Sequence, residues 1–154
     1  MKGIVNLSKN SLSFFNIAFE QAQSAFAHDE VPVGAVLVKD GVVIASSPNK
    51  MRQNSDATAH AEMLCLREAC QLLRTQQLTD CDLYVTLEPC PMCACAIANA
   101  RVRRVFFGAY DEKGGGVDHG PRVFEHTLHK PDVAGGINEI LCAQLLSDFF
   151  KQKR

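Results

Sequence analysis

Two short motifs constrain the fold of this 154-residue chain more than any other feature. The first is Thr58-Ala59-His60-Ala61-Glu62. The second, Leu87-Glu88-Pro89-Cys90-Pro91-Met92-Cys93, follows after a gap long enough for one helix and one strand. Histidine and cysteine are ligands that suit zinc, and a catalytic zinc site uses three protein ligands and leaves the fourth position open. His60, Cys90 and Cys93 supply that number, so the fold has to bring the two motifs together.

The second motif predicts a helix that begins at Pro91. Proline suits the first helical position because its missing N–H would have no partner there. Such a helix brings Cys90 and Cys93 onto one face, with about 5–6 Å between their Cβ atoms. The partial positive charge at the helix start also favours the thiolate form of both cysteines. Taken alone, this motif is equally compatible with a structural zinc half-site, a redox pair or two buried side chains.

The first motif separates two roles. His60 and Glu62 are two residues apart, so in a regular helix their side chains point about 200° away from each other. They cannot both be ligands on one helical face. If the helix begins near Ala59, His60 binds a metal from the first turn and Glu62 reaches the reacting water. Glu62 is therefore predicted to carry protons rather than to bind the metal.

Hydrophobic spacing predicts an α/β chain. The Asp40-Gly41 pair tolerates positive φ angles and predicts a type I′ hairpin between two antiparallel strands. Two strand-then-helix units follow, which predicts an α/β sheet with right-handed crossovers and a ligand site beyond the carboxyl ends of its strands. The expected helices are 13–27, capped by Ser11 or Ser13, then 59–74, 91–100 and 139–152, and the expected strands are 34–38, 42–45, 83–87 and 102–107.

Length and cysteine usage limit the class of protein. We expect one domain over residues 1–154, with residues 1–12 disordered. Seven cysteines at uneven spacing do not resemble a secreted disulfide framework. Residues 1–12 lack the apolar core of a signal peptide, and no stretch approaches the roughly 18 apolar residues of a membrane span. We therefore expect a cytoplasmic protein that does not bind membranes.

The net charge of −1 gives no overall attraction to nucleic acid. Residues 1–100 hold 7 Lys and Arg against 10 Asp and Glu, whereas residues 101–154 hold 9 against 7. Any RNA binding has to use local basic clusters, each of which is equally compatible with an ordinary solvated face. These clusters are Arg101 with Arg103 and Arg104, Lys151 with Lys153 and Arg154, and Lys50 with Arg52.

The combined pattern His-x-Glu followed by Pro-Cys-x-x-Cys is the known signature of the zinc nucleobase deaminases. From about Phe14 to Arg154 the chain resembles the bacterial tRNA-specific adenosine deaminases, within the cytidine deaminase-like superfamily. Asn49, Asp111 and the aromatic C-terminal helix favour the tRNA branch. The segments that carry the resemblance are 30–36, Asn49, 58–62, 84–93, 104–108 with Asp111, and 145–150.

The resemblance implies a three-layer α/β/α cytidine deaminase-like fold with a mixed five-stranded sheet, and a homodimer with one Zn²⁺ per subunit. It implies deamination of the wobble adenosine in a tRNA anticodon stem-loop to inosine. By motif, His60, Cys90 and Cys93 would bind zinc and Glu62 would move protons. The implied substrate contacts are Asn49 on the flipped purine, Val33 packed on the base, Ala61 and Pro89 around the reacting water, and Asp111, Phe149 and Phe150 beside the flanking nucleotides.

Some features depart from the family pattern. The chain differs from the family pattern in segments 114–120 and 131–136 and at Tyr110. In the family these regions flank the substrate pocket, so the differences affect RNA contacts and leave the zinc chemistry intact. Two alternative functions follow. One is a deaminase of a free nucleobase or nucleoside such as cytosine, cytidine or guanine, and the other is a non-catalytic zinc module that binds RNA or protein.

Several further residues resemble site residues without matching a known site. His119, His126 and His129 lack the spacing of a metal-ligand set, and we interpret them as exposed or structural. Cys95 should rotate away from Cys93, and we interpret it as a small packing residue. The same interpretation applies to Cys65, Cys70, Cys81 and Cys142. The Phe149-Phe150 pair fits a core position or a base-stacking position equally well.

Overall fold

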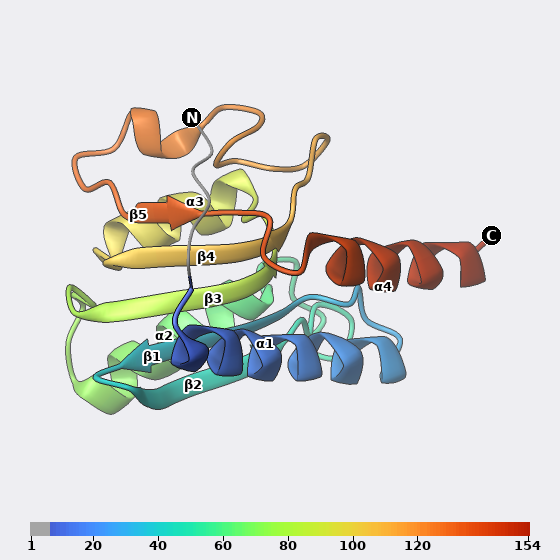
Figure 1. Ribbon diagram of the computed structural model, residues 1–154, viewed down its shortest axis with the longest axis horizontal. Coiled ribbons are helices and arrows are strands. Elements are labelled where there is room, and N and C mark those ends of the chain that lie inside the picture. Colours follow the sequence, from blue (N-terminus) through green and yellow to red (C-terminus); the bar gives the residue numbers. More distant parts are fainter. Residues whose placement is uncertain (1–6) are drawn as a thin grey trace.

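A computed structural model describes residues 7–154 and shows a five-stranded sheet with helices on both faces (Figure 1). The elements, in chain order, are α1 (Lys9–Ala27), β1 (Gly34–Lys39), β2 (Val42–Pro48), α2 (Ala61–Leu73), β3 (Cys81–Leu87), α3 (Pro91–Asn99), β4 (Arg104–Ala109), the short 3₁₀ helix η1 (Val123–Glu125), β5 (Asp132–Ala134) and α4 (Glu139–Gln152).

The sheet is mixed, with the strand order β2-β1-β3-β4-β5. β1 is antiparallel to both β2 and β3, whereas β3, β4 and β5 are parallel to one another. Asp40 and Gly41 have φ angles of 51° and 74°, which confirms the predicted type I′ turn. The mixed five-stranded sheet implied by the resemblance is confirmed as well. β5 lies within segment 131–136, where the sequence pattern predicts only a turn.

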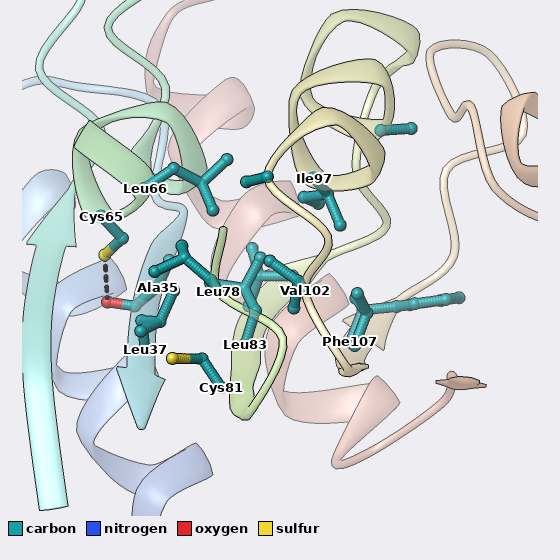
Figure 2. Packing of buried hydrophobic residues seen from close by; sticks show 14 of the residues in the cluster. Ala35, Leu37, Cys65, Leu66, Leu78, Cys81, Leu83, Ile97, Val102 and Phe107 are labelled. Atoms are coloured by element: carbon teal, nitrogen blue, oxygen red, sulfur yellow. Dashed lines mark hydrogen bonds between the residues drawn. The ribbon is translucent and has the colours of Figure 1, made fainter. Parts of the chain in front are cut away.

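The helices form two layers with the sheet between them, which confirms the three-layer arrangement. α1 and α4 cover one face of the sheet, and α2 and α3 cover the other (Figure 1). Each face has its own hydrophobic core. Phe15 and Cys142 pack under α1 and α4, and Leu37, Leu83 and Ile97 pack under α2 and α3, the latter group shown in Figure 2.

Two helix starts differ from the sequence prediction. α1 begins at Lys9, because Ser8 caps it by accepting a hydrogen bond from the backbone N–H of Ser11 at 3.1 Å. Residues 9–12 are therefore helical rather than disordered, and residues 1–6 lie outside the described part of the chain. α2 begins at Ala61 rather than near Ala59, with His60 in extended conformation directly before it.

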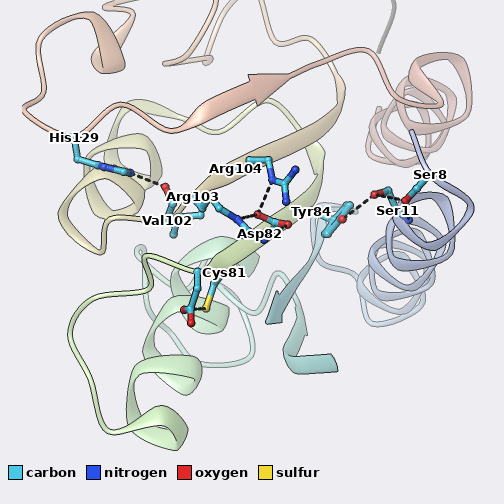
Figure 3. A network of polar contacts seen from close by, with 10 residues as sticks. Ser8, Ser11, Cys81, Asp82, Tyr84, Val102, Arg103, Arg104 and His129 are labelled. Carbon is cyan, nitrogen blue, oxygen red and sulfur yellow. Dashed lines mark hydrogen bonds and ion pairs between the residues drawn. The ribbon is translucent and has the colours of Figure 1, made fainter. Parts of the chain in front are cut away.

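A polar network at the start of β3 and β4 uses part of the expected basic surface (Figure 3). The buried Asp82 carboxylate accepts hydrogen bonds from Arg103 Nε at 3.0 Å and Nη2 at 3.1 Å, and from Arg104 Nε at 3.1 Å. Tyr84 donates a hydrogen bond to Ser11 Oγ at 3.2 Å and so ties α1 to the sheet. Two of the three cations in the first basic cluster therefore share one internal carboxylate, which offsets one of their two positive charges.

Within residues 7–154, no helix combines the length and the apolar character that crossing a lipid bilayer requires.

Candidate active site

The three expected metal ligands converge at the starts of two helices. His60 directly precedes α2, Cys90 directly precedes α3, and Cys93 lies in the first turn of α3. His60 Nδ1 lies 3.6 Å from Cys90 Sγ and 3.5 Å from Cys93 Sγ, and the three ligand atoms all lie within 4.8 Å of one another. Tetrahedral bonds of about 2.05 Å to nitrogen and 2.3 Å to sulfur place these atoms about 3.6 Å apart. The donor set therefore fits zinc in both chemistry and spacing.

The local electrostatics favour a negative charge on Cys90, whereas the hydrogen bond with Cys90 and burial raise the pKa of Cys93. Hydrogen bonding from the Cys93 thiol, aided by His60 and the Cys93 backbone N–H, outweighs burial and lowers the pKa of Cys90. The hydrogen bond between His60 and Cys90 raises the pKa of His60, although partial burial acts in the opposite direction. A thiolate at Cys90 therefore forms readily, and thiolate is the form that binds a soft cation.

Glu62 is the carboxylate beside the ligands. It lies in the first turn of α2 and is buried, with 4% of its surface exposed. Burial raises the pKa of Glu62, against the opposing effects of its own backbone N–H and of His60. A carboxyl group with a raised pKa holds a proton more readily, which suits a group that accepts a proton and then returns it. This environment supports the predicted role of Glu62 as a proton carrier.

Glu62 and the ligands open into a pocket of about 280 Å³. This volume is close to the lower limit of roughly 300 Å³ for ordinary small-molecule sites, so the pocket suits a ligand of the size of one nucleobase. Most of its lining surface is apolar, which fits a flat aromatic ring. The lining residues are Val31, Val33, Asn49, Met51, His60, Ala61, Glu62, Leu87, Glu88, Cys90, Asp111 and Gly114.

Asn49 is held in a fixed orientation in this pocket. Its Nδ2 donates to the Val31 carbonyl at 3.3 Å, and its Oδ1 accepts from the Met51 backbone N–H at 3.2 Å. A primary amide has two N–H groups and two acceptor lone pairs. Asn49 therefore retains one donor and one acceptor position for hydrogen bonds to a bound base.

The expected site residues do not all lie in the pocket. Val33, Ala61 and Asp111 line it, as expected from the resemblance. Within residues 7–154 the lining does not include Pro89, Phe149 or Phe150. The Pro89 carbonyl instead accepts a hydrogen bond from Gly116 at 2.8 Å.

The two C-terminal phenylalanines have different environments. Phe149 is buried with its ring edge-to-face against Phe26 at 5.7 Å between centroids, which is the core position that the sequence left open. The neighbouring Phe150 is 48% exposed. Of these two phenylalanines, Phe150 is therefore the one whose ring is accessible for stacking on a base.

Sequence reasoning missed two buried carboxylates, Glu88 in the lining of the pocket and Glu30 directly before the lining residue Val31. Glutamate is almost never fully buried unless it is paired. Glu30 accepts hydrogen bonds from the backbone N–H groups of Arg52 at 2.8 Å and Gln53 at 3.1 Å, and so fixes the loop that carries Met51. The available signal was a charged residue within each of two otherwise apolar motifs, Glu30-Val31-Pro32-Val33 and Leu87-Glu88-Pro89.

The other three histidines singled out in the sequence lie outside the group of His60, Cys90 and Cys93. His119 Nδ1 contacts Glu88 at 2.8 Å, His129 Nε2 contacts the Val102 carbonyl at 2.6 Å, and His126 is exposed. Among residues 7–154, the group of three or more metal-type side chains is the one formed by His60 with the two cysteines.

Cys95 differs from its predicted packing role. The side chain turns away from Cys93 as the helical spacing requires, but it is exposed to solvent rather than packed. The reason is that α3 contacts the sheet with its opposite face, where Ala94 and Ile97 are buried.

A ligand set of one histidine and two cysteines, with a glutamate beside it that is not a ligand, is the arrangement of the zinc nucleobase deaminases. The fold and the site therefore define a deaminase. More particularly, the chain belongs to the MafB19-like deaminase family, whose model matches residues 9–154.

Individual relatives show which kinds of deaminase this chain is similar to. The tRNA-specific adenosine deaminase of Agrobacterium fabrum is 51% identical, over 92% of this chain and 94% of that protein. A solved structure of a tRNA:A34 deaminase is 50% identical with a TM-score of 0.85, over 87% of this chain and 99% of that one. The guanine deaminase of Bacillus subtilis is 42% identical with a TM-score of 0.63, over 68% of this chain and 66% of that one.

Proposed function

We propose that this protein deaminates adenosine to inosine at the wobble position of a tRNA anticodon, with one zinc ion per subunit held by His60, Cys90 and Cys93. The observation that carries the proposal is the position of these ligands beside Glu62 in a pocket of nucleobase size. The relatives described as tRNA-specific adenosine deaminases and as acting in A-to-I editing support the choice of substrate.

When held by His60, Cys90 and Cys93, zinc would lower the pKa of a water molecule and so supply a nucleophile near neutral pH. Glu62 would accept a proton from the attacking water as its oxygen adds to the amine-bearing carbon of the ring. The Glu62 carboxyl group would pass this proton to the ring nitrogen. It would then take the remaining proton from the added hydroxyl group and give it to the amine, which leaves as ammonia as the carbon–nitrogen bond breaks and the carbonyl forms. The raised pKa of Glu62 suits both halves of this exchange.

Asn49 orients the base through its remaining donor and acceptor, and Val33 packs on the ring. A base has to leave its stack before it can enter such a pocket, which costs a few kcal/mol and is easiest in a loop. An anticodon loop meets this requirement. We propose that Asp111, Phe150 and Pro89 act on nucleotides or groups next to the reacting base, and that Phe149 supports Phe150.

The RNA backbone would meet side chains from two of the basic clusters. Arg52 and Lys153 both pair with Asp29, which joins the loop that follows Asn49 to the end of α4. We propose that their chain neighbours Lys50, Lys151 and Arg154 add to this surface. We also propose a homodimer, which sedimentation would report as twice the mass of one chain, and a cytoplasmic location, where tRNA is available.

The direct test uses an anticodon stem-loop with adenosine at the wobble position and mass-spectrometric detection of inosine. Glu62→Gln should lower kcat by about 10²–10⁴-fold with zinc retained, since it removes a general acid–base group. Glu68→Gln, which changes an exposed carboxylate on the same helix, is the control and should be neutral. If Glu62→Gln changes no measurable function, the protein is a non-catalytic zinc module.

A second candidate substrate is free guanine, which the similarity to a guanine deaminase favours. Measuring ammonia release from a panel of free bases, nucleosides and the stem-loop RNA distinguishes the two candidate substrates. Salt dependence gives a second criterion. Binding through Z phosphates of single-stranded RNA gives a log–log slope of about −0.7Z, whereas a small neutral base gives almost none.

A further inference from the structure

The side chain of Glu88 is fully buried, with 0% of its surface exposed, and the proposed chemistry does not use it. It lies between the end of β3 and Cys90. Glu88 Oε1 accepts hydrogen bonds from the Asp111 backbone N–H at 3.1 Å and from His119 Nδ1 at 2.8 Å. Oε2 accepts from the backbone N–H groups of Val117, Asp118 and His119 at 3.2, 3.0 and 3.1 Å.

All five donors belong to one segment, residues 111–119, which follows β4. A carboxylate offers about four lone-pair positions, so this arrangement saturates it. Saturation distinguishes Glu88 from Glu62 and leaves Glu88 no free position from which to exchange a proton with a substrate.

Segment 111–119 forms one wall of the pocket through Asp111 and Gly114. Asp111 Oδ1 accepts hydrogen bonds from the N–H groups of Lys113 at 3.2 Å and Gly114 at 2.8 Å, which fixes the turn. A Cβ atom on Gly115 would lie 2.4 Å from Glu88 Oε2, and one on Gly116 would lie 2.5 Å from Pro91 N. The glycines therefore let the segment close tightly over Glu88 and the start of α3.

His119 adds a side-chain contact to this arrangement. A carboxylate is only an acceptor, so the proton of the contact with Glu88 is on His119 Nδ1. The His119 ring also lies edge-on to Tyr110 at 6.0 Å, and Tyr110 lies edge-on to Phe107 at 5.1 Å. These contacts connect the wall to the sheet core.

We propose that Glu88 and His119 are positioning residues that hold segment 111–119 as the wall against which the substrate binds. This inference rests on the proposed function for its substrate, but the fixed segment itself is a property of the protein alone. Loss of the contacts releases Asp111 and Gly114 from the pocket. Substrate binding weakens, while the zinc ligands and Glu62, which lie on other elements, retain their places.

The first test measures hydrogen exchange of the segment and kinetics on the anticodon stem-loop in the zinc-loaded protein. Glu88→Gln leaves buried donors without an acceptor. It should speed exchange at residues 111–119 and raise KM about 10–100-fold, with a smaller change in kcat and one zinc per chain retained. Glu112→Gln, which alters an exposed carboxylate of the same segment, should match the unaltered protein in both measurements.

The second test remains decisive if Glu88→Gln fails to fold. His119→Ala removes one hydrogen bond to a charged group and should raise KM about 10-fold. His119→Asn places an amide N–H near the position of Nδ1 and should restore most of the loss. His126→Ala, at an exposed histidine, should have no effect.

Two results would overturn the proposal. One is unchanged hydrogen exchange at residues 111–119 in both Glu88→Gln and His119→Ala. The other is a fall in kcat with KM unchanged in Glu88→Gln, which would mean that Glu88 takes part in the reaction itself. The unaltered protein could make no inosine while the variants still show faster hydrogen exchange at residues 111–119. That result would support the fixed segment and reject the proposed substrate.

Discussion

The contact between α1 and β1 gives a prediction of stability that can be worked from the structure. A Cβ atom on Gly34 would lie 2.1 Å from the Ala18 carbonyl oxygen and 2.4 Å from Ala22 N, whereas ordinary contacts begin at 3.4 Å. In Gly34→Ala the helix and the strand would have to separate by about an ångström. The opposing atoms are backbone and cannot rotate away, so the cost should reach the upper end of the 1–3 kcal/mol range of overpacked cores, about 3 kcal/mol.

For a chain of this length, about 3 kcal/mol lowers Tm by about 6–12 °C. Differential scanning calorimetry measures this shift. Gly41→Asn is the matched control, because a Cβ atom there meets nothing within 4 Å and asparagine tolerates the positive φ of the turn. An unchanged Tm in Gly34→Ala, or an equal fall in both variants, would refute the reasoning.

Three further predictions concern the site. Glu30→Gln should raise KM for the stem-loop about 10-fold by releasing the loop that carries Met51, with Glu20→Gln, at an exposed carboxylate, as a neutral control. Removing zinc with a chelator should lower Tm, and zinc at about 100 times its Kd should restore about 2.7 kcal/mol in a urea titration. Because the pKa of Glu88 is lowered from 4.5 in the folded protein, its contribution to stability is complete above pH 4.5 and is lost as the pH falls through the folded pKa. The acid arm of the stability profile should therefore be flatter in Glu88→Gln, and identical profiles would contradict this assignment.

Local patterns predicted those features that depend on one or two residue types. Asp40-Gly41 specified a type I′ turn because both positions need positive φ, and both have it. Pro91 specified the start of α3 because proline needs a position without an N–H partner. Since His60 and Glu62 cannot share a helical face, the sequence also divided their roles, and the structure places His60 with the cysteines and Glu62 in the pocket.

Features that depend on distant partners were not predictable in this way. β5 is only three residues long and forms a strand because the edge of β4 is available to it. The role of Glu88 depends on backbone N–H groups 23 to 31 residues further along the chain, and a backbone N–H has no sequence signature. Phe149 could be assigned to the core only once α4 was seen against Phe26.

The most direct test of the central claim is single-turnover conversion of the anticodon stem-loop by the zinc-loaded protein, compared with Glu62→Gln. We predict one inosine at the wobble position, release of one ammonia, and a rate lower by about 10²–10⁴-fold in Glu62→Gln at unchanged zinc content. Equal rates in the two proteins, or deamination of free guanine with the stem-loop left intact, would contradict the account.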